Sequence, residues 1–185
     1  KLLLNFTWWV NRKDPQGLNI FEGGFLGLDN IGVFDRSRPL PTGGHIEQSD
    51  GTAWMAMFSI NMLRMSIELS ERDAVYENMT IKFLEHFLYI AEAMTDMGSE
   101  GIGLWDDQDN FFYDVLSMPS GQKIPMRLRS MVGLIPLFAV GIVEQEVINK
   151  RPELWRKIET YRERRPDLTK LVSRWNEVGA KGRRL

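Results

Sequence analysis

Two neighbouring stretches, residues 50–69 and 73–97, carry large apolar side chains at the spacing of an α-helix. The apolar positions are Trp54, Met57, Phe58, Met62 and Met65 in the first, and Val75, Met79, Phe83, Phe87 and Ile90 in the second. A recurrence every three or four residues places such side chains on one face of a helix. Ser49 or Asp50 can cap the first helix, and Asp73 can begin the second. This pattern predicts two amphipathic helices and restricts the fold more than any other feature.

Three further stretches have helical patterns, near residues 1–13, 130–143 and 153–178. The stretch 130–143 is so apolar that we expect it to be buried on most sides. The stretch 153–178 has a basic face and is broken near Pro166. No strand pattern is long enough to build a sheet. The chain is therefore expected to be all-α, with helical hairpins joined by long loops.

Two long segments without a helical period, residues 15–48 and 98–124, separate these helices. The first is rich in glycine and proline, yet it holds many large apolar side chains, which argues against disorder. Ordered loops of this length inside a compact domain are usually functional. We therefore expect the functional residues in these two loops.

Asp29 stands out in the first loop, because the stretch GGFLGLDNIGVFDRS surrounds it with glycines and apolar side chains. Glycines let a ligand or a backbone approach where a side chain would block it. A carboxyl group among apolar side chains has a raised pKa, so it can keep a proton near neutral pH and donate it. Alternatively, Asp29 caps a backbone N–H group in a buried turn. The spacing alone leaves both interpretations open.

The second loop contains the acidic and aromatic stretch LWDDQDNFFYD, residues 104–114. Its alternate acids would suit calcium, but the glycine and closing glutamate of an EF-hand loop are missing. Trp105 either stacks on a sugar ring or fills the core. No HExxH, GxGxxG, P-loop or GxSxG pattern occurs, which argues against zinc proteases, dinucleotide enzymes, NTPases and α/β hydrolases. We predict no metal and no cofactor.

Composition narrows the class of protein further. The chain contains no cysteine, which removes disulfides and zinc–thiolate sites and favours a reducing, cytoplasmic location. It has no apolar run of about 18 residues, so no membrane span is expected. Residues 150–185 carry twelve Lys and Arg against five Asp and Glu. Because these residues interrupt a helical apolar pattern, they indicate a solvated helix face, and we predict no nucleic-acid partner.

Four separated blocks resemble glycoside hydrolase family 63 and its relatives among the trehalases. They are GGFLGLDN with an arginine a few residues on, EQSDGTAW at the start of a helix, GLWDDQDNFFYDVL, and MRLRSMVGLIPLFAV. The blocks occur in the family's order, and the match covers nearly the whole of residues 1–143. The resemblance implies about half of an (α/α)6 toroid, with the active site at the mouth where the loops gather. It also implies inverting hydrolysis of α-glucosidic bonds.

The resemblance assigns roles to individual residues. The aspartate of its first block is the family's general acid, and it falls on Asp29. Arg36 stands further from Asp29 than the family's arginine usually does. The expected substrate is an oligosaccharide or a small α-glucoside, held by polar side chains that bond to hydroxyl groups and by tryptophans that stack on a sugar ring. These candidates are Glu22, Asn30, Arg36, Gln48, Asp50, Trp8, Trp54 and Trp105.

The general base of such an enzyme has no counterpart in this sequence. Inverting hydrolysis needs two carboxyl groups about 6.5–9.5 Å apart, with water between the base and the sugar. We therefore expect residues 1–185 to be a fragment of a single catalytic domain, inactive alone, with the remainder of that domain as its partner. Two alternatives stay open: a non-catalytic helical binding or scaffold module, and a degenerate glycosidase that binds sugar without turnover.

Overall fold

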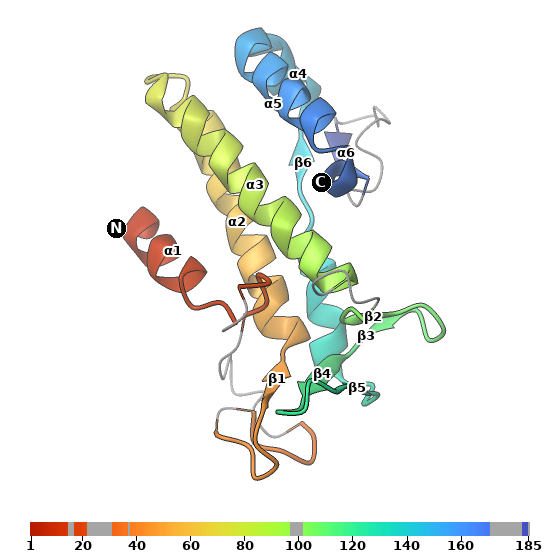
Figure 1. Ribbon diagram of the computed structural model, residues 1–185. Coiled ribbons are helices and arrows are strands. Elements are labelled where there is room, and N and C mark those ends of the chain that lie inside the picture. Colours follow the sequence, from red (N-terminus) through yellow and green to blue (C-terminus); the bar gives the residue numbers. More distant parts are fainter. Residues whose placement is uncertain (15–16, 22–30, 37, 97–101, 171–182, 185) are drawn as a thin grey trace. The chain divides into compact units, whose positions relative to one another are not determined.

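The computed structural model describes residues 1–185 except 15–16, 22–30, 37, 97–101, 171–182 and 185. Two helices dominate it, α2 (Ser49–Leu69) and α3 (Val75–Thr95), and they correspond to the helices predicted over residues 50–69 and 73–97 (Figure 1). The contacts between residues divide the chain into two compact units, with boundaries inside α2 and α3. The first unit is Lys1–Met55 with Glu92–Phe138, and the second is Ala56–Ala91 with Ala139–Leu185.

The first unit contains helix α1 (Leu2–Val10) and two antiparallel sheets. Strands β1 (His45–Glu47), β4 (Asp114–Ser117) and β5 (Lys123–Met126) form one sheet in the order β1-β4-β5. Strands β2 (Trp105–Asp106) and β3 (Phe111–Phe112) form a hairpin. All four residues of the central strand β4 are buried, whereas Pro125 lies in the edge strand β5, where its missing N–H group is tolerated.

The prediction of an all-α chain is wrong, because antiparallel sheets form within the segments that were predicted as loops. The chain is accordingly not half of an (α/α)6 toroid. β1 lies in the segment 15–48, and β2, β3 and β4 lie in the segment 98–124. Strands of two to four residues are too short to show the two-residue alternation that identifies a strand in a sequence.

Residues 130–143 also differ from the prediction of a helix buried on most sides. They contain a 3₁₀ helix, η2 (Met131–Phe138), which includes Pro136, a residue without a backbone N–H group. A Cβ atom on Gly133 would lie 2.1 Å from Phe111 Cε1 and 2.3 Å from the Phe112 carbonyl oxygen, so the absence of a side chain lets η2 pack on β3. Only one side of η2 is buried, at Val132, Gly133 and Ile135.

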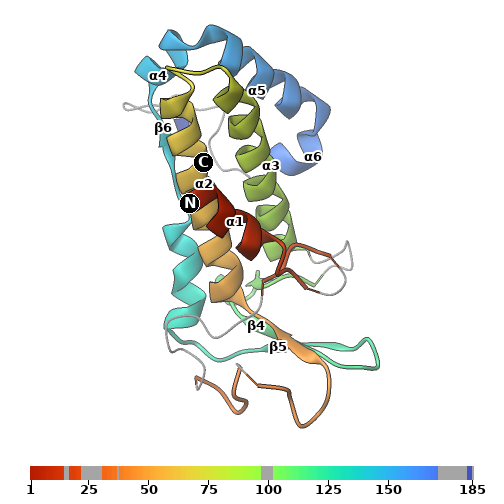
Figure 2. The same cartoon turned by 90° about the vertical axis from the view of Figure 1, so that its left-hand side faces the viewer.

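The second unit contains most of α2 and α3, followed by β6 (Ile142–Val143), α4 (Gln145–Lys150), α5 (Pro152–Arg164), α6 (Pro166–Thr169) and β7 (Arg183–Arg184). The helix predicted over 153–178 is thus interrupted at Pro166, and residues 171–182 lie outside the described residues. α5 runs beside α3 (Figure 2), and Lys157 Nζ donates to Glu77 Oε2 at 2.6 Å between them. Leu154 and Ile158 form the buried face of α5.

Candidate functional site

Four of the predicted substrate contacts gather at the N-terminal end of α2. The side chain of Arg36, only 4% exposed, forms an ion pair with Asp50, which is fully buried. Gln48 Nε2 donates a hydrogen bond to the Arg36 carbonyl oxygen at 3.1 Å. Trp54 follows Asp50 by one helical turn. The structure thus brings together Arg36, Gln48, Asp50 and Trp54.

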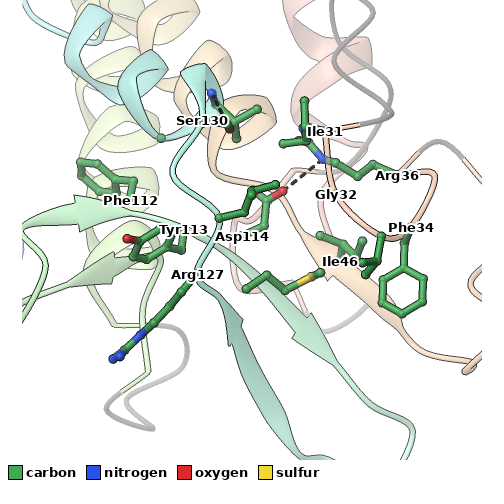
Figure 3. A pocket seen from close by; sticks show the side chains of 15 residues that line it. Ile31, Gly32, Phe34, Arg36, Ile46, Phe112, Tyr113, Asp114, Arg127 and Ser130 are labelled. Atoms are coloured by element: carbon green, nitrogen blue, oxygen red, sulfur yellow. Dashed lines mark hydrogen bonds and ion pairs between the residues drawn. The ribbon is translucent and has the colours of Figure 1, made fainter.

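Asp114, on β4, is a second buried carboxylate in this cluster and was not predicted from the sequence. Its Oδ2 lies 3.1 Å from Arg36 Nε, an ion pair that Figure 3 shows. Its Oδ1 accepts hydrogen bonds from the backbone N–H of Ser49 at 2.9 Å and from Ser49 Oγ at 3.1 Å. Asp114 therefore caps α2 from a distant strand. The signal in the sequence is one acid inside the apolar run FFYDVL.

Burial raises the pKa of Asp114 above its ordinary value. The positive charge of Arg36 and the hydrogen bonds from Ser49 act in the opposite direction, and the negative charge of Asp50 adds to the increase. Removal of the carboxylate from water disfavours its charged form, and here that effect outweighs the single shared cation. The cluster therefore holds two buried carboxylates with one buried arginine between them.

Four buried polar atoms within residues 47–54 have no hydrogen-bond partner among the residues that the structure describes. They are Glu47 Oε2, Gln48 Oε1, Asp50 Oδ2 and Trp54 Nε1. A buried polar atom without a partner costs roughly 1–3 kcal/mol, and native proteins contain few of them. Three acceptors and one donor close together in the sequence are a set that hydroxyl groups can satisfy, because a hydroxyl both donates and accepts.

A cavity of about 370 Å³ adjoins Arg36 and Asp114 (Figure 3). One wall is formed by residues 31–34, and the first of these stands two positions after Asp29 in the sequence. The other walls come from the sheet and from η2, and they include Ile46, Phe112, Tyr113, Met126 and Val132. The cavity is therefore mostly apolar, with a few charged groups at its border, as small-molecule sites usually are.

The other two tryptophans predicted as substrate contacts, Trp8 and Trp105, make their contacts elsewhere in the first unit. Trp8, on α1, is 49% exposed, and the Arg12 guanidinium lies 3.9 Å from the centre of its ring. Trp105, on β2, donates from Nε1 to Asp107 Oδ1 at 2.9 Å and packs on Phe112. Because Phe112 lines the cavity, Trp105 supports a cavity wall. The predicted general acid Asp29 and the predicted contacts Glu22 and Asn30 lie outside the described residues.

The described part of the chain holds no group of three or more His, Cys, Asp or Glu side chains suited to a metal ion. Among the same residues, no helix is both long enough and apolar enough to cross a lipid bilayer.

Comparison with known proteins finds a yeast relative whose name states no activity. No protein-family model matches the sequence, and no solved structure matches it significantly. The chain is 48% identical over 179 residues to the uncharacterized protein YMR196W of Saccharomyces cerevisiae. The match covers 91% of this chain but only 16% of the yeast protein. The chain therefore spans about a sixth of the length of that relative.

Proposed function

We propose that this chain is the acid-bearing part of an inverting glycosidase that hydrolyses α-glucosidic bonds, similar to glycoside hydrolase family 63. Asp29 protonates the leaving oxygen as general acid, and a general base from outside residues 1–185 activates the attacking water. The substrate is an oligosaccharide or a small α-glucoside. Because the yeast relative is far longer than this chain, a polypeptide of its size has room for the missing base. A cytoplasmic location belongs to the same proposal.

The observation that carries the proposal is the set of buried atoms at the start of α2 that lack a partner in the described part of the chain. Gln48 Oε1 and Asp50 Oδ2 can accept hydrogen bonds, and Trp54 Nε1 can donate one. Neighbouring hydroxyl groups of a sugar ring supply partners for both kinds of atom. The sequence already made these three residues candidates, Gln48 and Asp50 as partners of hydroxyl groups and Trp54 as a stacking wall or a core residue.

Arg36 and the cavity support this proposal. The ion pair with Arg36 engages Asp50 Oδ1, which also accepts from the Gly51 N–H at 2.8 Å, so Oδ2 is the oxygen left for a ligand. The cavity wall formed by residues 31–34 follows Asp29 by only a few residues. A general acid needs mostly apolar surroundings that raise its pKa, and this cavity supplies such surroundings close to Asp29 in the sequence.

Product analysis by proton NMR tests the reaction. The full-length parent polypeptide, containing residues 1–185, is incubated with a panel of α-glucosides, and the anomer released first is recorded. We expect β-glucose first, and we expect Asp29→Asn to lower the rate by about 100-fold or more without loss of folding. Asp35→Asn is the control, because Asp35 is a second acid of the same loop that pairs with the exposed Arg38. Full activity of Asp29→Asn, or no turnover of any glucoside, would contradict the proposal.

A second candidate is a non-catalytic binding or scaffold module, favoured by the way the charged cluster joins separate segments. Asp114 on β4 pairs with Arg36 in the loop and accepts hydrogen bonds from Ser49 at the start of α2. Such contacts stabilise a fold without any ligand. Trp54→Phe separates the two candidates, because it removes the unpartnered Nε1 and keeps an aromatic ring. The glycosidase hypothesis predicts that Trp54→Phe binds an α-glucoside about tenfold more weakly than the wild type does, as measured by calorimetry. The scaffold hypothesis predicts that neither the wild type nor Trp54→Phe binds the glucoside. It also predicts that the variant is as stable as the wild type or more stable.

A further inference from the structure

Helix η2 presents a row of exposed apolar side chains. A 3₁₀ helix has three residues per turn, so side chains three positions apart lie above one another. Met131, Leu134 and Leu137 form such a row, which we call the exposed η2 row, and they are 65%, 45% and 62% exposed. The neighbouring row begins with two buried side chains, since Val132 and Ile135 are only 3% and 4% exposed, and becomes exposed at its end, Phe138. One side of η2 therefore packs on its own unit and another side does not.

The composition of this segment indicates what kind of surface would cover it. Residues 131–143 contain no charged and no polar side chain, and Phe138 beside the row is 52% exposed. Burial of large apolar side chains away from water is favourable. Contiguous exposed apolar patches mark interaction sites more often than free surface. The partner of the exposed η2 row is therefore expected to be apolar.

We propose that the exposed η2 row docks against another part of the same polypeptide, outside residues 1–185. The length of the yeast relative favours this partner. The matched segment, at 48% identity, makes up only 16% of that protein, so most of such a polypeptide lies outside the matched region. A linked segment is present at a fixed one-to-one ratio and at high effective concentration, which favours it over a second copy. The inference shares with the proposed function only the longer parent polypeptide, and it does not depend on glycoside hydrolysis.

Cysteine labelling measures this contact directly, because residues 1–185 contain no cysteine. Leu134→Cys and Ser120→Cys are each introduced into the full-length parent polypeptide. Ser120 lies in the exposed turn between β4 and β5 and provides the control. The reaction of each site with a maleimide is followed by peptide mass spectrometry. We expect Cys at 134 to react at least about tenfold more slowly than Cys at 120, and both to react equally in denaturant.

Two results would overturn the proposal. Equal reaction at positions 134 and 120 in the native polypeptide means that nothing covers the row. Protection at 134 that disappears on dilution to a monomer means that a second copy is the occupant. A second measurement guards against local disturbance by the cysteine. Leu137→Gln should lower the thermal unfolding temperature of the parent polypeptide by several degrees, and Ile124→Gln, at an exposed apolar position on β5, should lower it less. Equal shifts would count against docking.

Discussion

The ion pairs at the start of α2 and those on α5 place the same kinds of side chain in opposite surroundings. Arg36, Asp50 and Asp114 have side chains that are 4%, 0% and 8% exposed. Arg156 and Glu153 on α5 are 2.6 Å apart, but their side chains are 73% and 69% exposed. Exposed pairs contribute little to stability, whereas each buried charge depends on its partners. The contribution of an ion pair to stability therefore depends more on the burial of its two charges than on the distance between them.

This difference also separates a candidate site from ordinary surface. Replacement of a buried ion cluster by apolar residues is often neutral or stabilising, so stability alone is a weak reason to keep charges there. The start of α2 holds two carboxylates, one arginine and several unpartnered polar atoms. Such a concentration supports the proposed ligand site, because stability alone does not require it. The surface of α5 needs no such explanation.

The largest effect is expected from Arg36→Met. This change leaves Asp50 and Asp114 buried without their cation, and it should lower the free energy of unfolding by about 3–5 kcal/mol. Urea unfolding measures it. Arg38→Met is the matched control, because Arg38 is 79% exposed and pairs with Asp35 at 3.2 Å, and it should cost less than about 1 kcal/mol. Similar losses in both variants would remove the distinction between buried and exposed pairs.

Removal of all three charges sharpens the same comparison. The triple variant Arg36→Met, Asp50→Asn and Asp114→Asn leaves no buried charge without a partner in the cluster. It should recover more than half of the stability lost in Arg36→Met alone. Binding of an α-glucoside, measured by calorimetry, should stay absent. Recovery of both stability and binding would show that the cluster is not part of a sugar site.

Asp114→Asn should have a smaller effect that depends on pH. Because burial raises the pKa of Asp114 in the folded protein, its contribution to stability is full below its ordinary value of 3.8 and is lost as the pH rises through the folded-state pKa. The stability of wild type relative to Asp114→Asn should therefore fall between pH 4 and 7, by about 1.4 kcal/mol for each unit of pKa increase. Urea unfolding across this range measures the difference. A difference that rises with pH would mean that Arg36 outweighs burial.

Glu77→Gln tests an ion pair of intermediate burial. Lys157 Nζ lies 2.6 Å from Glu77 Oε2, with side chains that are 46% and 19% exposed. We expect a loss of about 0.5–1 kcal/mol, because one partner is largely shielded from water. Thermal unfolding at low and high salt should show that added salt reduces the loss. A loss as large as that of Arg36→Met would contradict the dependence on burial.

Glu153→Gln should produce the smallest effect. Its pair with Arg156 is exposed on both sides and joins positions three residues apart on one helix. Pairs of this kind contribute about 0.2–0.5 kcal/mol. Chemical denaturation of Glu153→Gln and Glu77→Gln under the same conditions ranks their losses in free energy of unfolding. An effect larger than that of Glu77→Gln would reverse the order proposed here.

The sequence was a good guide where a pattern extends over several turns. The ends of α2 and α3 lie within two residues of the predicted ranges 50–69 and 73–97. The sheet β1-β4-β5 was missed because its strands have three or four residues and because the edge strand contains Pro125. The apolar character of 130–143 was recognised, but the prediction that this segment is buried on most sides was wrong. Apolarity alone does not distinguish a side chain that is buried in its own unit from one that is exposed there.

The candidate site shows the same limit. Arg36, Gln48, Asp50 and Trp54 were predicted from residue type and resemblance, and the structure places them together. Asp114 was missed because its partners are made by tertiary structure, 65 residues away at Ser49. A single acid in an apolar run indicates burial, but it does not say which cation or backbone group it meets. Asp114 and its partners come together only in the folded protein, where β4 pairs with β1.

The bond between Asp114 and Ser49 has a consequence for the order of folding. It closes a loop of 65 residues, whereas the Arg36–Asp50 pair closes one of 14. Loop-closure entropy opposes the longer connection more, and long-range contacts slow folding. We therefore expect the Arg36–Asp50 pair to form early and the cap on α2 to form late, when β4 docks. A weakened cap should then accelerate unfolding while leaving the refolding rate nearly unchanged, so this carboxylate controls how long the folded state lasts.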